Sequence, residues 1–179
     1  MRRALPGIAL RCLPLLLFAA CTVEPPAGTP VPPVSGTLER GPRETAFGRT
    51  GAEVIGNPQL RDKIRTLFGP DWSPSAESHG KIAQGASAYF GRNEPPRGVR
   101  IGDRNYVAVT GCAPANCRGD RVLLLIQEGG DTLLARLDEG GYSHYYAYGA
   151  DWGLAGSTAR AVDSGLRALE RSGDPYPRS

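Results

Sequence analysis

The chain has 179 residues, of which 21 are Lys or Arg and 18 are Asp or Glu. Three of the basic residues, Arg2, Arg3 and Arg11, lie in a predicted N-terminal export signal, so 18 basic residues are balanced by 18 acidic ones once it is removed. A nucleic-acid or anionic-surface partner requires a basic stripe, which a neutral chain of this composition does not offer. The composition therefore excludes nucleic-acid binding.

Residues 1–20 are predicted to be a lipoprotein signal peptide. Arginines at the start are followed by the apolar run Leu15–Phe18 and by two alanines before Cys21. The apolar part is too short for a membrane span and is interrupted by Pro14. The sequence Phe18-Ala19-Ala20-Cys21 resembles the bacterial lipobox, which makes Cys21 the predicted lipidation site; the alternative is a plain secretory signal that is cleaved nearby.

The residue after Cys21 is Thr22 rather than Asp, which by analogy with lipoprotein sorting favours the outer membrane, facing the periplasm. We expect the lipid to be the chain's contact with the membrane. Residues 21–44 are predicted to be a Pro-rich tether, because they contain six prolines and few apolar side chains. The remaining residues, 45–179, suit a single domain with one core.

Two helices are predicted at the start of the domain. The first begins at Asn57-Pro58, a cap followed by a proline that fits the first helical turn, and buries Leu60, Ile64, Leu67 and Phe68 on one face. The second is predicted over Ser78–Phe90, with Ile82, Ala86, Tyr89 and Phe90 forming its stripe; Gly80 and Gly85 disfavour it.

An antiparallel meander and a last helix are predicted to follow. The expected strands are 99–101, 106–110, 122–126, 132–137 and 142–148, and the expected helix is 157–171. The unbroken apolar run Val122–Ile126 indicates a strand that is buried on both faces. This order of elements predicts an α+β fold, an antiparallel β-sheet with helices packed on it and a protruding disulfide loop.

The strand 142–148 places Tyr142, His144, Tyr146 and Tyr148 on one face. Two interpretations of this row are open. It could be a platform for a sugar or a flat protein surface, because tyrosine offers a large contact area with a polar tip. It could also pack under a helix, with Trp152 as a neighbour, and this second interpretation is the one the pattern favours.

Cys112 and Cys117 stand at the two ends of a loop between the predicted strands 106–110 and 122–126. In an exported chain two such cysteines favour a disulfide, which contributes roughly 2 kcal/mol for so short a loop. A loop held in this way makes contacts at a low ordering cost. The predicted partner-binding loop consists of Ala113, Pro114, Ala115, Asn116 and Arg118.

The segment from Val99 to Leu137 resembles the inhibitor of vertebrate lysozyme (Ivy) family. The resemblance lies in the order of its parts: a strand that begins with Tyr, then Thr110-Gly111-Cys112, four residues that include Pro114, then Cys117, and finally an apolar strand. The resemblance implies an α+β domain whose loop plugs the catalytic cleft of a C-type lysozyme. The family loop usually carries Lys before the proline and His-Asp after it, and that His reaches the enzyme's carboxylates. Here the inhibitory His is absent, because these positions are Ala113 and Ala115-Asn116.

No catalytic constellation is recognisable, so the chain is not expected to be an enzyme or to need a cofactor. Its histidines, His79 and His144, lie outside known catalytic motifs. A zinc site made of these histidines and the two loop cysteines is disfavoured by the exported context. The tripeptide Arg118-Gly119-Asp120 matches an adhesion motif. The favoured interpretation is that its Gly and Asp let the loop turn into the following strand.

Two hypotheses for the function follow. In the first, the domain binds a protein through the Cys112–Cys117 loop, either a lysozyme-type muramidase or another envelope or host protein; a homodimer is compatible with this. Restoring His-Asp at positions 115 and 116 is then expected to strengthen inhibition of a C-type lysozyme. In the second, the chain is a structural or accessory envelope lipoprotein without inhibitory activity.

Overall fold

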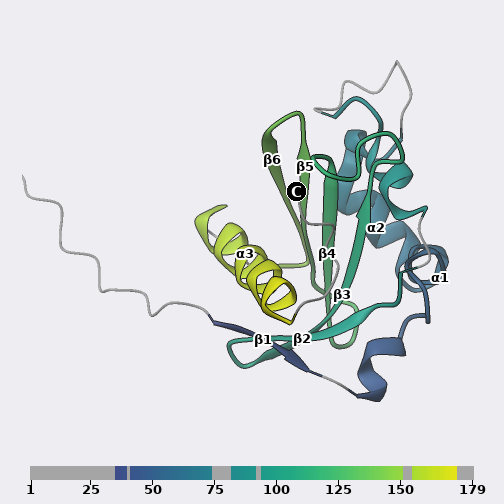
Figure 1. Cartoon of the computed structure of the whole chain (residues 1–179). Coiled ribbons are helices and arrows are strands. Elements are labelled where there is room, and N and C mark those ends of the chain that lie inside the picture. The colour runs from purple at the N-terminus through teal and green to yellow at the C-terminus, as the bar shows by residue number, and fades with distance from the viewer. Residues whose placement is uncertain (1–34, 40, 74–81, 92–93, 151–154, 173–179) are drawn as a thin grey trace, which may run out of the picture. The chain divides into compact units, whose positions relative to one another are not determined.

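The computed structural model describes residues 35–39, 41–73, 82–91, 94–150 and 155–172. They belong to one compact unit, Pro33–Ser179. Six strands form one antiparallel sheet in the order β1-β2-β3-β4-β5-β6, so each strand pairs with the next one along the chain. Helix α3 covers one face and α1 and α2 cover the other (Figure 1). The predicted α+β class is confirmed.

The strands are β1 (Gly36–Glu39), β2 (Arg97–Ile101), β3 (Arg104–Cys112), β4 (Arg121–Gln127), β5 (Leu133–Glu139) and β6 (Tyr142–Tyr148). The α-helices are α1 (Gly51–Gly56), α2 (Arg61–Phe68) and α3 (Ala155–Arg171). Short 3-10 helices are η1 (Pro42–Thr45), η2 (Gly69–Asp71) and η3 (Ala86–Phe90).

The sheet separates two layers of apolar side chains. Alternate residues of β4 point to opposite faces, so Leu124 packs with the layer under α1 and α2 while Leu123 and Leu125 pack with the layer under α3. Both layers exclude water, which explains why residues Val122–Ile126 are apolar without a break. In α3, Val162, Leu166 and Leu169 are buried as the sequence predicts.

The first predicted helix starts later than expected. Asn57 Oδ1 accepts a hydrogen bond from the Gln59 N–H at 2.8 Å, so Asn57 and Pro58 build a turn in front of α2, which begins at Arg61. The predicted apolar face is nevertheless buried. Helix α1 was not predicted, although its capping residue Thr50 accepts a hydrogen bond from the Glu53 N–H at 3.2 Å.

The second predicted helix, Ser78–Phe90, is wrong over the residues that the structure describes. Residues 82–85 are not helical and only η3 forms after them, while 78–81 lie outside the described residues. Gly85 has a positive φ of +70°, so a continuous right-handed helix cannot run through this position. The Ala83 N–H donates to Glu139 Oε2 at 2.9 Å instead of to a helical carbonyl.

The predicted boundary between tether and domain is also wrong. Strand β1 lies inside the segment 21–44, and it pairs with β2 so that Leu38 stands opposite Val99. Helix η1 follows directly, so the folded unit begins before Thr45. The signal segment, Cys21 and Trp152 lie outside the described residues. Among the helices that are described, none has the length and apolar character needed to cross a membrane.

Candidate functional site: the disulfide loop

The loop between β3 and β4 is closed by the predicted disulfide. Cys112 is the last residue of β3 and pairs with Arg121, the first residue of β4. Cys112 and Cys117 are bonded, with their Cα atoms 4.8 Å apart. The bond therefore ties the tip of the loop to the end of a central strand of the sheet.

Main-chain hydrogen bonds fix the rest of this loop. The Ala113 N–H donates to the Asp120 carbonyl at 3.0 Å, which extends the ladder one step past the strands. The Asn116 N–H donates to the Ala113 carbonyl at 3.2 Å, and the Asp120 N–H donates to the Asn116 carbonyl at 2.9 Å. Each bond spans only a few residues, so the loop backbone is held in one conformation.

The Asn116 side chain is part of that framework. Its Nδ2 donates to Asp120 Oδ2 at 3.1 Å, and its Oδ1 accepts from the Gly119 N–H at 3.2 Å. The sequence analysis placed Asn116 in the predicted partner-binding loop. In the structure one amide N–H and the carbonyl oxygen of this side chain are used inside the loop, so Asn116 also has a structural role.

Asp120 anchors the loop to the neighbouring hairpin. The residue is only 9% exposed, and its Oδ1 accepts a hydrogen bond from the Gly140 N–H at 3.1 Å in the β5–β6 turn. A carboxylate directed into the protein is not presented for adhesion. The motif Arg118-Gly119-Asp120 therefore shapes the loop and does not serve adhesion, as the sequence analysis favoured.

The predicted loop residues divide into two groups. Ala113 is fully buried in the layer under α1 and α2, so its assignment as a partner-contacting residue is corrected. Pro114, Ala115, Asn116 and Arg118 are exposed. Within the described part of the chain, no hydrogen bond or ion pair engages the Arg118 side chain. The loop therefore presents Pro114, Ala115 and Asn116 at its tip, with the Arg118 cation beside them.

The base of the loop rests on η3. A Cβ atom at Gly111 would lie 2.2 Å from the Tyr89 carbonyl oxygen, so only glycine fits where β3 passes this helix. The buried Tyr89 hydroxyl donates to Glu139 Oε1 at 3.1 Å. Burial, and then the nearby Glu139 carboxylate, raise the pKa of Tyr89, so its hydroxyl stays protonated and keeps donating.

The tyrosine row on β6 mostly packs, as the sequence analysis favoured. Tyr146 and Tyr148 lie against the layer under α2, and the Tyr146 ring centroid is 4.9 Å from that of Phe68. The Tyr146 hydroxyl donates to Asp71 Oδ2 at 2.8 Å, and burial, followed by this bond, raises its pKa. Tyr142 is different, because 74% of its surface is exposed.

A metal centre was disfavoured by the sequence, and the two loop cysteines are unavailable as ligands because they are bonded to each other. Across the described ranges no group of three or more His, Cys, Asp or Glu side chains is placed to hold a metal ion. His144 is half-buried on β6, and His79 lies outside the described residues.

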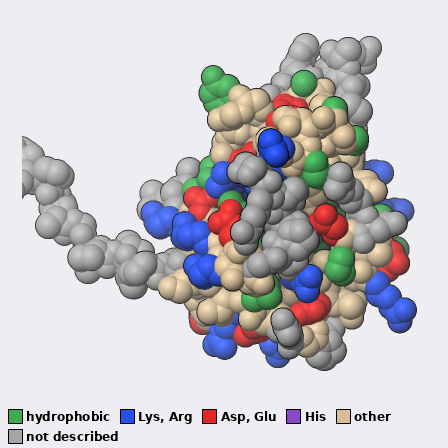
Figure 2. All heavy atoms as spheres, viewed as in Figure 1, with side chains coloured by type: hydrophobic (Ala, Val, Ile, Leu, Met, Phe, Trp, Pro, Cys, Tyr) green, Lys and Arg blue, Asp and Glu red, His purple; other side chains and the backbone are tan. Residues whose placement is uncertain are grey.

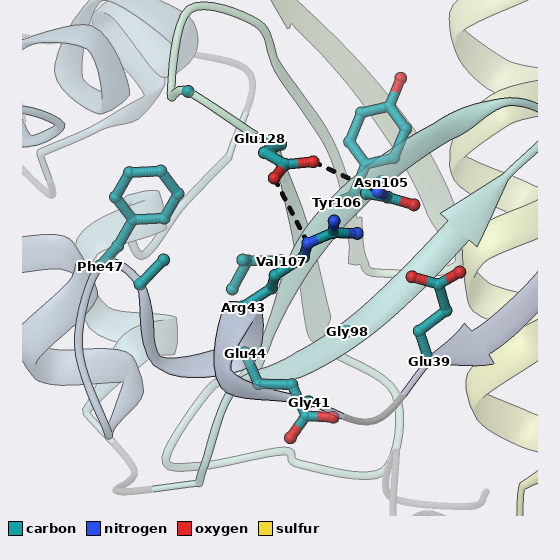
Figure 3. Close-up of a pocket in the computed structure, with 12 residues that line it drawn as sticks. Glu39, Gly41, Arg43, Glu44, Phe47, Gly98, Asn105, Tyr106, Val107 and Glu128 are labelled. Atoms are coloured by element: carbon teal, nitrogen blue, oxygen red, sulfur yellow. Dashed lines mark hydrogen bonds and ion pairs between the residues drawn. The ribbon is translucent and has the colours of Figure 1, made fainter.

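A hollow of about 380 Å³, which the sequence did not indicate, lies between η1, the β2–β3 pair and the β4–β5 turn (Figure 3). Glu128 is one of the lining residues, and its Oε1 is 3.3 Å from Arg43 Nε while its Oε2 accepts from Asn105 Nδ2 at 3.2 Å. Phe47 and Val107 supply apolar wall. The hollow combines residues from distant parts of the sequence, so no local motif could have revealed it.

Acidic and basic side chains are interspersed over the face shown in Figure 2. This agrees with the near-neutral composition and offers no broad field of one sign. A scan against protein-family models, a search of curated proteins and a search of solved structures each found no match to the chain.

Proposed function

We propose that the chain is an exported bacterial lipoprotein whose domain binds a protein partner through the tip of the disulfide loop. The observation that carries the proposal is the combination of a closed, internally hydrogen-bonded loop with an exposed tip. Ordering a flexible loop on binding costs free energy, and a loop that is already ordered avoids that cost. The resemblance to the Ivy family rests on this same segment.

The partner class that best fits this loop is a lysozyme-type muramidase. Such enzymes carry paired carboxylates in their cleft, and a charged donor near them forms a strong hydrogen bond. Arg118 is the exposed cation beside the tip. Ala115, however, offers no donor where the family loop has its imidazole. We therefore propose weak inhibition of C-type lysozymes, or a related target in the envelope or in a host.

The sharpest test is a single gain-of-function change, Ala115→His. It places an imidazole at an exposed position without touching the bonds that close the loop. Asn116 must be kept: Asn116→Asp would remove the amide donor and set a carboxylate beside Asp120 Oδ2, now 3.1 Å from Asn116 Nδ2. The double His-Asp exchange that the sequence suggested would thus weaken the loop it was meant to improve.

The proposed location is the bacterial cell envelope, with a lipid on Cys21 and the domain facing the periplasm from the outer membrane. Cys21→Ser removes the thiol that would be acylated, so this variant is expected to move from the membrane fraction to the soluble fraction. Fractionation followed by immunoblotting measures the change. Unaltered sedimentation of the variant with membranes would place the anchor elsewhere.

The alternative is an accessory envelope lipoprotein that works through the sheet rather than the loop. The exposed Tyr142 and the outer edge of β6 favour it. It differs from the first proposal in a measurable way, because a histidine in the loop would then change nothing.

A further inference from the structure

Strand β6 forms one outer edge of the sheet. It pairs with β5 over Tyr142–Tyr148, and on its other side no main-chain hydrogen bond joins it to any described residue. Unpaired N–H and C=O groups along a strand form a template for another strand. Among the described residues, these groups of β6 are the ones with which a further strand would pair.

The groups that point outward can be assigned from the turn. Gly140 and Gly141 have φ +59° and +85°, the signature of a type I′ turn, and they connect the paired residues Glu139 and Tyr142. The pair that closes such a turn exchanges both hydrogen bonds, and the pattern then alternates along the ladder. The free N–H and C=O groups consequently belong to Ser143, Tyr145 and Ala147.

The two edges of the sheet are protected to different degrees. Strand β1 has four residues, its Gly36 carbonyl accepts a hydrogen bond from the Arg171 guanidinium, and its Glu39 pairs with Arg100 at 3.7 Å. Strand β6 has seven residues with no Pro, Lys, Arg, Asp or Glu among them. Those residues are what edge strands use to prevent pairing. Their absence indicates an edge that is meant to be covered.

The sequence of β6 indicates what covers it. Read outward from Tyr145, the residues are His144 and Tyr146, then Ser143 and Ala147, then Tyr142 and Tyr148, so matching sizes and chemistry lie at equal distances. We propose that two copies of this chain pair β6 with β6 in antiparallel fashion about a two-fold axis at Tyr145. The two six-stranded sheets then become one.

This register satisfies all the outward groups. Tyr145 exchanges both main-chain bonds with Tyr145 of the second copy, and Ser143 does the same with Ala147 of the second copy. Ser143 and Ala147 are small, so they leave room beside the two Tyr145 side chains that face each other. On the other face, the exposed Tyr142 gains Tyr148 of the second copy as an aromatic neighbour, a favourable cross-strand pair.

Tyr145 is already oriented for this arrangement. Its hydroxyl donates to Asp163 Oδ1 at 3.0 Å, and the Arg136 guanidinium lies 5.8 Å from its ring centroid. Tyr145 as a whole residue is nevertheless 38% exposed. A side chain with a fixed position and a free flank loses little freedom on pairing.

The dimer would leave both disulfide loops open. Each loop is bonded to the β5–β6 turn through Asp120 and Gly140, at the Tyr142 end of β6. A two-fold axis at Tyr145 sends the two turns in opposite directions. The pairing of copies and the binding of a partner by the loop can therefore succeed or fail separately.

The test is a pair of charge variants in the full chain, with Cys12→Ser and Cys21→Ser so that only the loop cysteines remain. In Ser143→Lys with Ala147→Lys, lysines face each other twice across the axis. In the matched control, Ser143→Lys with Ala147→Glu, each lysine faces a glutamate. Sedimentation equilibrium should show a dimer for the native chain and the control, and a dissociation constant raised about tenfold or more for the double-lysine variant.

A cysteine scan checks the register. Tyr145→Cys should form a disulfide-linked dimer on mild oxidation, because the two residues face each other, whereas Ser143→Cys should not. A native chain that stays monomeric at high concentration would overturn the proposal. So would equal association of the two charge variants, which would assign any association to another part of the chain.

Discussion

A chain that begins at Thr45 is expected to be less stable than one that begins at Pro33 by about 3 kcal/mol or more. The shorter chain lacks β1, whose four residues pair with Gly98–Ile101 of β2. It also lacks Leu38, which packs against the layer under α3, and the Gly36 carbonyl that accepts from Arg171. Several hydrogen bonds and one apolar side chain are therefore lost together.

Urea unfolding of the two chains, followed by circular dichroism, measures this difference. The chain from Pro33 is the control, since it keeps every described residue. The shorter chain should unfold at lower urea concentration and should expose apolar surface of β2. Equal midpoints for the two chains would show that β1 is a loosely attached tail, as the Pro-rich composition first suggested.

Replacing Arg136 by Met is expected to destabilise the domain by about 3 to 5 kcal/mol. Arg136 Nε lies 2.8 Å from Asp138 Oδ1, and its NH1 atom lies 2.8 Å from Asp163 Oδ1. Burial lowers the pKa of the guanidinium, but the hydrogen bonds to these two carboxylates outweigh it and hold the pKa above its usual value. Met keeps the apolar stem and removes the charge.

The expected loss arises mostly from Asp138, which is only 8% exposed and would be left without its cation. Ser143 Oγ, which donates to Asp138 Oδ1 at 2.6 Å, cannot replace it. The control is Arg136→Met combined with Asp138→Asn, which removes both charges and should recover part of the loss. A single Met variant within about 1 kcal/mol of the native chain in chemical unfolding would contradict this account.

The sheet was predictable because its signals are local. Alternation fixes which residues of a strand share a face, and so Tyr146 and Tyr148 were assigned together before the structure placed both against the layer under α2. The unbroken run in β4 similarly indicated burial on both sides. Each of these patterns depends only on residues that are close together in the sequence, and so it can be read from one sequence alone.

Strand β1 and residues 82–85 were not predictable in the same way. Leu38 packs against the layer under α3 only because β2, far along the chain, lies beside it. The Ala83 N–H donates a hydrogen bond to Glu139, which lies 56 residues further along the chain and therefore does not enter a local helix propensity. In both segments a distant partner decides the conformation.

The loop shows the same limit at the scale of single residues. Ala113 and Ala115 are the same type of residue, yet Ala113 is buried in the core and Ala115 is exposed. Irregular backbone has no period from which the direction of a side chain can be read. Asn116 was expected to face a partner, and its role became clear only when closure of the hairpin placed Asp120 beside it.

The most direct test of the central claim is an inhibition titration of a C-type lysozyme with the full chain. Native protein should inhibit weakly, and Ala115→His should lower the inhibition constant roughly tenfold to a hundredfold, because a desolvated carboxylate gains a partner. Ala52→His, at an exposed alanine of α1, is the matched control and should behave like the native chain. Tight inhibition by the native chain would show that the loop needs no imidazole, and an Ala115→His variant that folds normally but inhibits no better would contradict a loop presented to such a cleft.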